Sequence, residues 1–266
     1  MADVGPVLFV GDSVTRYQYM TLIHFLASGK YQHPFDGRES LSDALRHRPT
    51  KLHNQYDMLW VHAKNQISEH STGGSPGLNY QHNRSAHLER AHLALRLHID
   101  PSRKAHLYYG YVGSGVFEMQ EAIDWAMNQR QDWRYLILNV CAHYTKDYTE
   151  AISRDVIAVV EWARQRYGDA FDKAGTQLVW KSCTTPQEKV RDLLDVEERK
   201  IAQYATATGL RIYDTRSVAK AATDQHLVTT WSAKEVHYLQ FMYEQWNDLL
   251  LNILCPAAHA GFKEYR

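Results

Sequence analysis

Apolar residues occur along the chain in short continuous runs, each followed by a longer segment in which they recur every three to four positions. The clearest run is Val7–Val10, which stops at Gly11 and is typical of a strand buried on both faces. Tyr17–Ala27 follows with helical periodicity. Further strands are predicted at 58–62, 106–111, 135–140, 177–180 and 210–213, and further helices at 86–97, 118–129, 149–167, 187–207 and 239–254.

This alternation of strands and helices predicts an α/β fold, a mainly parallel sheet with helices on both faces. No linker rich in Pro, Gly or Ser and no internal repeat divides the chain, so residues 1–266 are expected to form a single domain. The segment 29–77 is the exception. It is polar and His-rich with one clear strand, which is typical of an insertion running over the surface.

Composition and charge narrow the function classes. The 30 Lys and Arg balance 30 Asp and Glu, so the long-range field of a nucleic-acid-binding protein is absent, and no nucleic-acid partner is expected. No apolar run approaches the roughly 20 residues of a membrane span, and the N-terminus lacks a signal-peptide pattern. The chain as given is expected to be soluble. Its compartment stays open, because a segment removed before Val7 would make the protein secretory.

The three cysteines, Cys141, Cys183 and Cys255, are odd in number and far apart in sequence. That arrangement fits neither a disulfide framework nor a close-spaced zinc site, so they are predicted to be buried thiols. No metal motif is present, since His87 and His92 are five residues apart and lack the spacing of a helical zinc pair. Neither a metal nor an organic cofactor is expected.

Ser13 is the first candidate for chemistry. The tripeptide Gly11-Asp12-Ser13 directly follows the first buried strand and precedes a helix, and the carboxyl ends of parallel strands are where open α/β sheets place ligands. Backbone N–H groups at a helix start can stabilise an oxyanion. An ordinary helix N-cap explains the same residues without catalysis. A serine nucleophile also needs a base, and His237, just before the last predicted helix, would fall at the same edge of the sheet.

Three blocks together resemble the SGNH/GDSL hydrolase superfamily, in particular its PC-esterase and trichome-birefringence-like branch. Gly11-Asp-Ser-Val-Thr-Arg-Tyr-Gln18 is similar to the first block of that branch. Leu136-Ile-Leu-Asn-Val-Cys-Ala-His143 is similar to its middle block. Glu235-Val-His-Tyr-Leu239 with Tyr243-Glu-Gln-Trp-Asn-Asp-Leu-Leu250 is similar to its closing block. The blocks occur in the expected order and span nearly the whole chain.

The resemblance implies a three-layer α/β/α sandwich and acyl-ester chemistry, usually on O-acetyl groups of sugars, by hydrolysis or by transfer to a glycan hydroxyl. It implies Ser13 as nucleophile and His237 as general base. It also implies that Asn139 donates its side-chain amide to the oxyanion, alongside the backbone N–H of Ser13. The expected partner is therefore an acylated carbohydrate or another small acyl ester.

The chain departs from the family pattern beside His237. The family has an Asp three residues before its His, but here that position is Lys234, which cannot orient an imidazole. Glu235, an Asp from elsewhere such as Asp214, or a backbone carbonyl could take over the role. Losing the orienting carboxylate costs orders of magnitude in rate without abolishing catalysis. The alternative function is therefore a catalytically impaired member of the family that binds glycans.

Three further roles concern the surroundings of this pair: a second oxyanion donor, and the functions of Arg16 and His143. The remaining oxyanion donor of the family is a loop glycine, for which Gly113, Gly115, Gly73 and Gly74 are the candidates, with Gly113 assigned to substrate binding. Arg16 would either hold a substrate carboxylate or lie on the solvent face of its helix. His143, four residues beyond Asn139, would either line the pocket or be a polar loop residue.

Overall fold

The computed structural model describes residues 5–31, 81–83, 88–113, 115–141, 151–184, 188–227 and 237–255. Within them, seven strands form one sheet in the order β2-β3-β4-β1-β5-β6-β7. Five neighbouring strands are parallel: β4 (Asp100–Tyr111), β1 (Val7–Gly11), β5 (Tyr135–Leu138), β6 (Gln177–Lys181) and β7 (Arg211–Tyr213). The short β2 (Gln81–Asn83) and the longer β3 (Leu88–Leu97) extend the β4 edge in antiparallel fashion.

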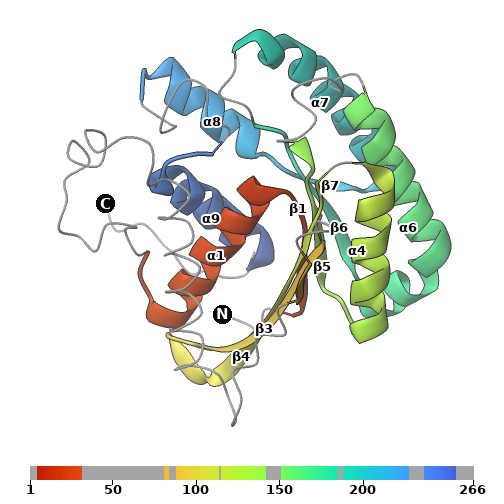
Figure 1. Cartoon of the computed structure of the whole chain (residues 1–266), viewed down its shortest axis with the longest axis vertical. Helices are drawn as coiled ribbons and strands as arrows, with labels where there is room; N and C mark the ends of the chain where they lie inside the picture. Colours follow the sequence, from red (N-terminus) through yellow and green to blue (C-terminus); the bar gives the residue numbers. More distant parts are fainter. Residues whose placement is uncertain are drawn as a thin grey trace.

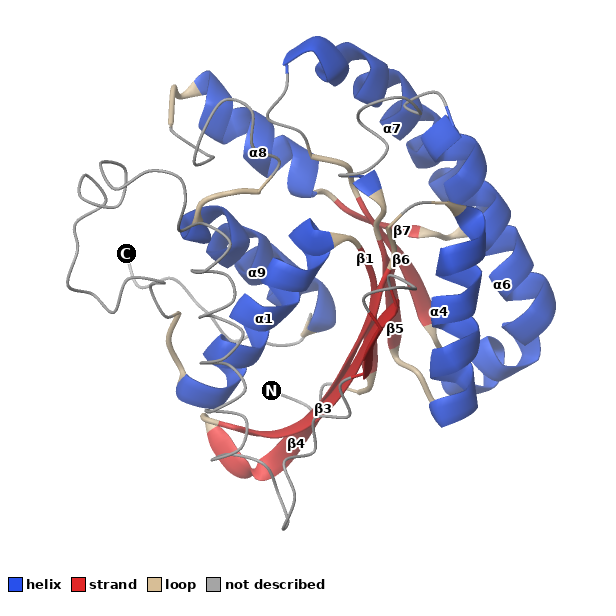
Figure 2. Ribbon diagram, viewed as in Figure 1, coloured by secondary structure: helices blue, strands red, loops and turns tan. Residues whose placement is uncertain are grey.

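Helices cover both faces of the sheet (Figures 1 and 2). One face carries α1 (Ser13–Ser28), α8 (Thr215–Asp224) and α9 (Gln240–Leu254), and the other carries α4 (Val116–Gln129), α6 (Ile152–Ala174) and α7 (Glu188–Thr208). None of the helices in the described part of the chain is long and apolar enough to cross a membrane. The predicted three-layer α/β/α architecture with a mainly parallel sheet is confirmed.

The central strand β1 shows why its continuous apolar run is required. Its side chains alternate between the two hydrophobic cores, because successive residues of a strand point to opposite faces. Val7 and Phe9 pack with α1 and α9, whereas Leu8 and Val10 pack with α4 and α6. All four side chains are fully buried. A polar residue at any of the four positions would therefore be placed in one core or the other.

The helix predicted at 86–97 is wrong, because this segment contains β3, which pairs with β4. Leu88, Ala91, His92 and Leu95 match the period of a helix, but Leu93, Leu95 and Leu97 also match the alternation of a strand. The antiparallel pairing with β4 decided between the two periods. Helix α8 and the three-residue β2 were not predicted, and the strand predicted at 58–62 lies outside the described residues.

The prediction that all three cysteines are thiols is also wrong, because Cys141 and Cys183 form a disulfide. The two residues follow β5 and β6, which are neighbours in the sheet, so their Cα atoms lie only 5.3 Å apart despite a sequence separation of 42. Cys255 is free and partly buried. The disulfide therefore joins two strand ends at the edge of the sheet that also carries Ser13.

Candidate active site

The turn between β1 and α1 presents Ser13 at the carboxyl end of the central strand. Asp12 is the N-cap of α1, and its side chain accepts hydrogen bonds from the backbone N–H of Val14 (2.9 Å) and of Thr15 (3.3 Å). The Tyr109 hydroxyl donates to the backbone carbonyls of Gly11 (3.0 Å) and Asp12 (3.1 Å). These bonds fix the backbone on both sides of the turn.

Gly11 is required for this turn by space. A Cβ atom at Gly11 would lie 2.5 Å from Thr15 Oγ1 and 2.8 Å from the Asn139 carbonyl oxygen. Both distances are too short for any side chain, and the second contact is with backbone that cannot move aside easily. Each residue of the Gly-Asp-Ser tripeptide thus has its own structural role. Gly11 allows close packing, Asp12 caps the helix, and Ser13 lies at the carboxyl end of the strand within reach of His237.

Ser13 and His237 meet at this edge although they are 224 residues apart in sequence. Ser13 Oγ lies 2.7 Å from His237 Nε2, the distance of a good hydrogen bond between a hydroxyl and an imidazole. His237 belongs to the segment just before α9, which packs beside α1 on the same face of the sheet. A serine hydroxyl hydrogen-bonded to an imidazole can lose its proton to that imidazole as the oxygen attacks a carbonyl.

One aromatic side chain packs against the His237 ring, and a second contacts the backbone beside it. The Tyr17 ring contacts it edge-to-face at 5.1 Å between centroids, and the Arg16 guanidinium lies 5.1 Å from the Tyr17 centroid. Arg16 also donates to the Tyr17 hydroxyl at 3.2 Å. The Tyr243 hydroxyl accepts from the backbone N–H of Tyr238, next to the histidine. Arg16 therefore contacts the same tyrosine that packs against the His237 ring.

Of the side chains considered for orienting the His237 ring, the structure describes only Asp214. Lys234 and Glu235 lie outside the described residues. Asp214 is the N-cap of α8, where its carboxylate accepts from the Ser217 backbone N–H (3.0 Å) and from the Ser217 and Ser182 hydroxyls. Asp214 is thus already committed to the start of another helix, and the structure does not bring it to His237.

Asn139 lies beside the turn, but its side chain faces other partners than the predicted oxyanion. Its Nδ2 donates to the Lys181 carbonyl (2.9 Å) and to Cys141 Sγ (3.2 Å), and its Oδ1 accepts from the Thr15 hydroxyl (3.1 Å). The residue is 2% exposed. Both amide protons are therefore in use, and in this conformation Asn139 connects β5, β6 and α1 without offering a donor to a reacting carbonyl.

The loop glycines are found at the end of β4, on the other side of β1. The Gly113 backbone N–H donates to the Glu118 carboxylate, so it too has a partner within the protein. Gly115 is the N-cap of α4 and has a φ of 91°, a conformation that favours glycine. Gly73, Gly74 and His143 lie outside the described residues. The backbone N–H of Ser13 is used by no hydrogen bond within the described part of the chain.

A buried lysine, which the sequence analysis did not single out, lies beneath the turn. Lys181 ends β6 and is 1% exposed, and its ammonium is 3.4 Å from Thr15 Oγ1 and 5.1 Å from the centroid of the Trp246 ring. Burial lowers the pKa of Lys181 to about 8, and the negative charge of Asp12 acts in the opposite direction. No signal in Gln-Leu-Val-Trp-Lys distinguishes this residue from an exposed strand-end lysine.

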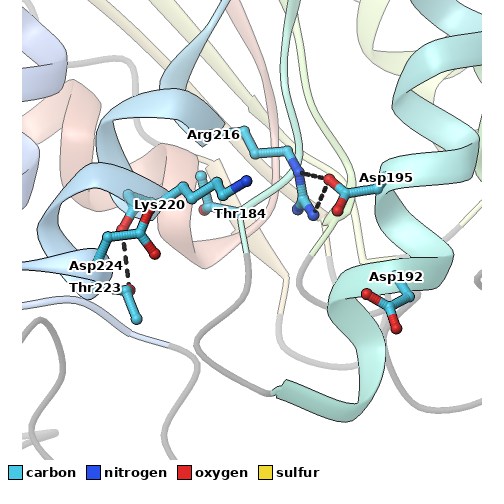
Figure 3. Close-up of a pocket in the computed structure, with 8 residues that line it drawn as sticks. Thr184, Asp192, Asp195, Arg216, Lys220, Thr223 and Asp224 are labelled. Atoms are coloured by element: carbon cyan, nitrogen blue, oxygen red, sulfur yellow. Dashed lines mark hydrogen bonds and ion pairs between the residues drawn. The ribbon is translucent and has the colours of Figure 1, made fainter.

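A pocket of charged side chains opens farther along the same edge, between α7 and α8 (Figure 3). It is named the outer pocket here, and it is lined by Thr184, Asp192, Asp195, Arg216, Ala219, Lys220, Thr223 and Asp224. Arg216 donates to Asp195 Oδ1 through Nε (2.8 Å) and Nη2 (2.5 Å). Among the described residues, no cluster of His, Cys, Asp and Glu side chains is arranged to hold a metal ion.

Comparison with known proteins identifies the fold. No family model and no curated protein matches the chain in sequence. Solved structures match over its whole length: a variant of Axe2, an acetylxylan esterase from Geobacillus stearothermophilus, is 12% identical with a TM-score of 0.51, covering 100% of this chain and 99% of the other. A catalytic mutant of Axe2 in which a histidine is replaced is 11% identical, with a TM-score of 0.50 and the same coverage. At such identity the match shows that this chain shares the α/β fold of these structures, and no more.

A further match is a structure from Parabacteroides merdae that is described as a GDSL-like lipase. It is 14% identical, with a TM-score of 0.48, and the alignment covers 93% of this chain and 95% of the other.

Proposed function

We propose that this chain is a serine-dependent ester hydrolase or O-acyltransferase of the SGNH/GDSL superfamily that acts on an O-acetylated carbohydrate. The observation that carries the proposal is the 2.7 Å hydrogen bond between Ser13 Oγ and His237 Nε2 at the carboxyl end of the central strand. Axe2, whose fold the chain shares, is an acetylxylan esterase. The three sequence blocks favour the PC-esterase branch, in which the same pair would perform the reaction.

In the proposed reaction His237 takes the Ser13 proton as Oγ attacks the acetyl carbonyl. The tetrahedral intermediate then collapses to an acetyl-enzyme while His237, now imidazolium, returns the proton to the departing sugar hydroxyl. Deacylation repeats the sequence with water or with a second sugar hydroxyl as the attacking group. The N–H of Ser13 is the backbone donor available to the oxyanion at the start of α1.

The aromatic contacts around His237 support its role as the base. Edge-to-face packing against Tyr17 fixes the plane of the imidazole, and Tyr243 fixes the backbone that follows it. We propose Glu235 as the group that orients the far ring nitrogen in place of the family aspartate. Arg16, Gly113 and His143 are proposed to contact the substrate around this pair, and the 29–77 segment is proposed to cross the surface of a single domain.

The test is labelling with a fluorophosphonate probe, together with hydrolysis of p-nitrophenyl acetate and of acetylated xylan. The parent is expected to react with the probe and to release acetate, and Ser13→Ala is expected to do neither while remaining folded. Ser28→Ala, at the other end of the same helix, is the matched control and should behave as the parent does. Hydrolysis by Ser13→Ala at the parental rate would show that Ser13 is only a helix residue.

Failure of the parent to react with the probe or to release acetate would favour the alternative function, that of a catalytically impaired glycan-binding protein. A protein that binds acetylated xylan in a pull-down assay but neither labels nor hydrolyses is a glycan-binding member of the superfamily.

A further inference from the structure

Lys181 is a fully buried cation for which the proposed reaction provides no role. It is 1% exposed, and it lies at the end of β6, two strands away from the strand that carries Ser13. Burying an ammonium is costly unless it is paired and hydrogen-bonded. A residue of this kind, close to a candidate nucleophile, requires a physical explanation beyond packing.

Three hydrogen bonds form a closed cycle through Lys181, Thr15 and Asn139. The Lys181 ammonium donates to Thr15 Oγ1 (3.4 Å), the Thr15 hydroxyl donates to Asn139 Oδ1 (3.1 Å), and Asn139 Nδ2 donates to the Lys181 carbonyl (2.9 Å). The three residues are at most 2% exposed. The cycle connects the ends of β5 and β6 to the first turn of α1, two residues after Ser13.

Lys181 and the oppositely charged Asp12 both bond to Thr15: the Asp12 carboxylate accepts from its backbone N–H (3.3 Å), and the Lys181 ammonium donates to its hydroxyl (3.4 Å). Asp12 is 0% exposed and directly precedes Ser13, and it is the charged group in the described part of the chain that acts on Lys181. The other groups that face the ammonium are neutral, namely Thr15 from α1 and the Trp246 ring from α9. Without the lysine, the turn that carries Ser13 would hold a buried carboxylate with no compensating charge, which would oppose the negative charge that develops on the substrate carbonyl oxygen during attack.

We propose that Lys181 is a positioning residue for the reaction at Ser13: its ammonium neutralises the buried Asp12 carboxylate and holds the Thr15 hydroxyl on Asn139. The inference rests on the proposed function. It assigns the Asn139 side chain to the support of the turn, and it makes the charge state of Lys181 a condition for fast attack by Ser13.

The test compares Lys181→Met, Asp12→Asn and the double variant, with Lys173→Met, an exposed lysine on α6, as the matched control. Asn is as good an N-cap as Asp, so Asp12→Asn removes the charge and keeps the cap. We expect Lys181→Met to lower kcat for p-nitrophenyl acetate by about 10–100-fold with little change in KM. The double variant, which has no buried charge at either position, should be faster than Lys181→Met.

The pH profile supplies a readout that a purely structural lysine would not change. The kcat of the parent should fall on the alkaline side as Lys181 loses its proton, since its pKa is about 8. The double variant should lack this alkaline limb, because it has no lysine to titrate and no carboxylate to compensate. Circular dichroism and thermal unfolding establish that each variant is folded, and the double variant keeps the test available if Lys181→Met alone does not fold.

Two results would overturn the inference and leave the proposed function standing. In the first, the parent is active and Lys181→Met has the parental kcat and pH profile. In the second, the double variant is slower than Lys181→Met by the full factor of Asp12→Asn, which means that the two charges act independently. An inactive parent, seen first in the labelling experiment, overturns the proposed function and this inference together.

Discussion

Two pairs of opposite charges lie along the same edge of the sheet, and they differ in burial. Asp12 and Lys181, beneath the Ser13 turn, are 0% and 1% exposed. Arg216 and Asp195, in the outer pocket, hold each other through two hydrogen bonds, but their side chains are 16% and 42% exposed. Water can replace a lost partner in the second pair and not in the first. Burial therefore decides how much the protein loses when one member of a charged pair is removed.

The two charged pairs, the inner pair Asp12 and Lys181 and the outer pair Arg216 and Asp195, also differ in the elements that they connect. The inner pair lies within hydrogen bonds that join α1, β5 and β6 around Ser13. The outer pair joins α7 to the start of α8, and Arg216 also contacts the Cys183 carbonyl at 3.3 Å. We therefore expect changes near Ser13 to affect turnover and changes in the outer pocket to have small effects on it.

The largest expected effect is the loss of turnover in His237→Ala. Removing the base should lower kcat by about 10⁴-fold or more, and the double variant with Ser13→Ala should be little slower than either single variant, because the two residues act as one unit. Initial rates on p-nitrophenyl acetate measure both. His98→Ala, an exposed histidine between β3 and β4, is the control. A multiplicative loss in the double variant would contradict the shared role.

The next effect is on stability, through the disulfide that joins the two regions. Cys141 lies beside Asn139 of the inner region, and Cys183 precedes Thr184 of the outer pocket. Because the cysteines are separated by 42 positions in sequence, replacing both by Ser should lower the free energy of unfolding by about 4 kcal/mol on the chain-entropy model. Urea denaturation measures it. Cys255→Ser should change stability far less, and equal losses in the two variants would refute the assignment.

A third, smaller effect concerns the pH dependence of stability. The folded pKa of Lys181 is about 8, below its value of about 10.4 in an unfolded chain. Between these values the unfolded chain binds more protons, so the free energy of unfolding of the parent should rise with pH relative to that of Lys181→Met, by up to about 3 kcal/mol. Denaturation of both proteins at pH 7 and pH 10 tests the sign. A constant difference would mean that Lys181 does not titrate in this range.

The smallest effect is expected in the outer pocket. Asp195→Asn should change the free energy of unfolding by about 1 kcal/mol or less, as is usual for partly exposed ion pairs, and should leave kcat/KM within about twofold. Urea denaturation and ester hydrolysis measure the two quantities. A tenfold loss of kcat/KM on acetylated xylan, with hydrolysis of p-nitrophenyl acetate unaffected, would contradict the small effect expected here. It would show that the outer pocket is part of the substrate site.

The sequence was sufficient for the main features of the fold and for the place of Ser13. Continuous apolar runs followed by helical periods require a sheet with two covered faces, and a tripeptide between such elements must lie at the carboxyl end of a strand. The segment 88–97 could not be assigned in the same way, because its leucines satisfy the helical and the strand period together. What decides the assignment is the antiparallel pairing with β4, the next strand along the chain, and the pattern of residues 88–97 alone does not contain that pairing.

The electrostatics of the site were not predictable from the sequence. Asn139 was expected to donate to an oxyanion, but the positions of its acceptors, the Lys181 carbonyl and Cys141 Sγ, depend on the order of strands in the sheet. The same order pairs Cys141 with Cys183. A lysine at the end of a strand is normally exposed, and only the packing of α1 and α9 over β6 buries this one.

The sequence separation of 224 between Ser13 and His237 has a consequence for biosynthesis. Strand β1 and Ser13 are synthesised before β4 and β5, the two parallel neighbours between which β1 lies in the sheet. His237 is synthesised only after β7 and α8. A nascent chain therefore holds an apolar strand without its parallel neighbours until β4 and β5 have been made, and Ser13 and His237 can meet only after translation has passed His237.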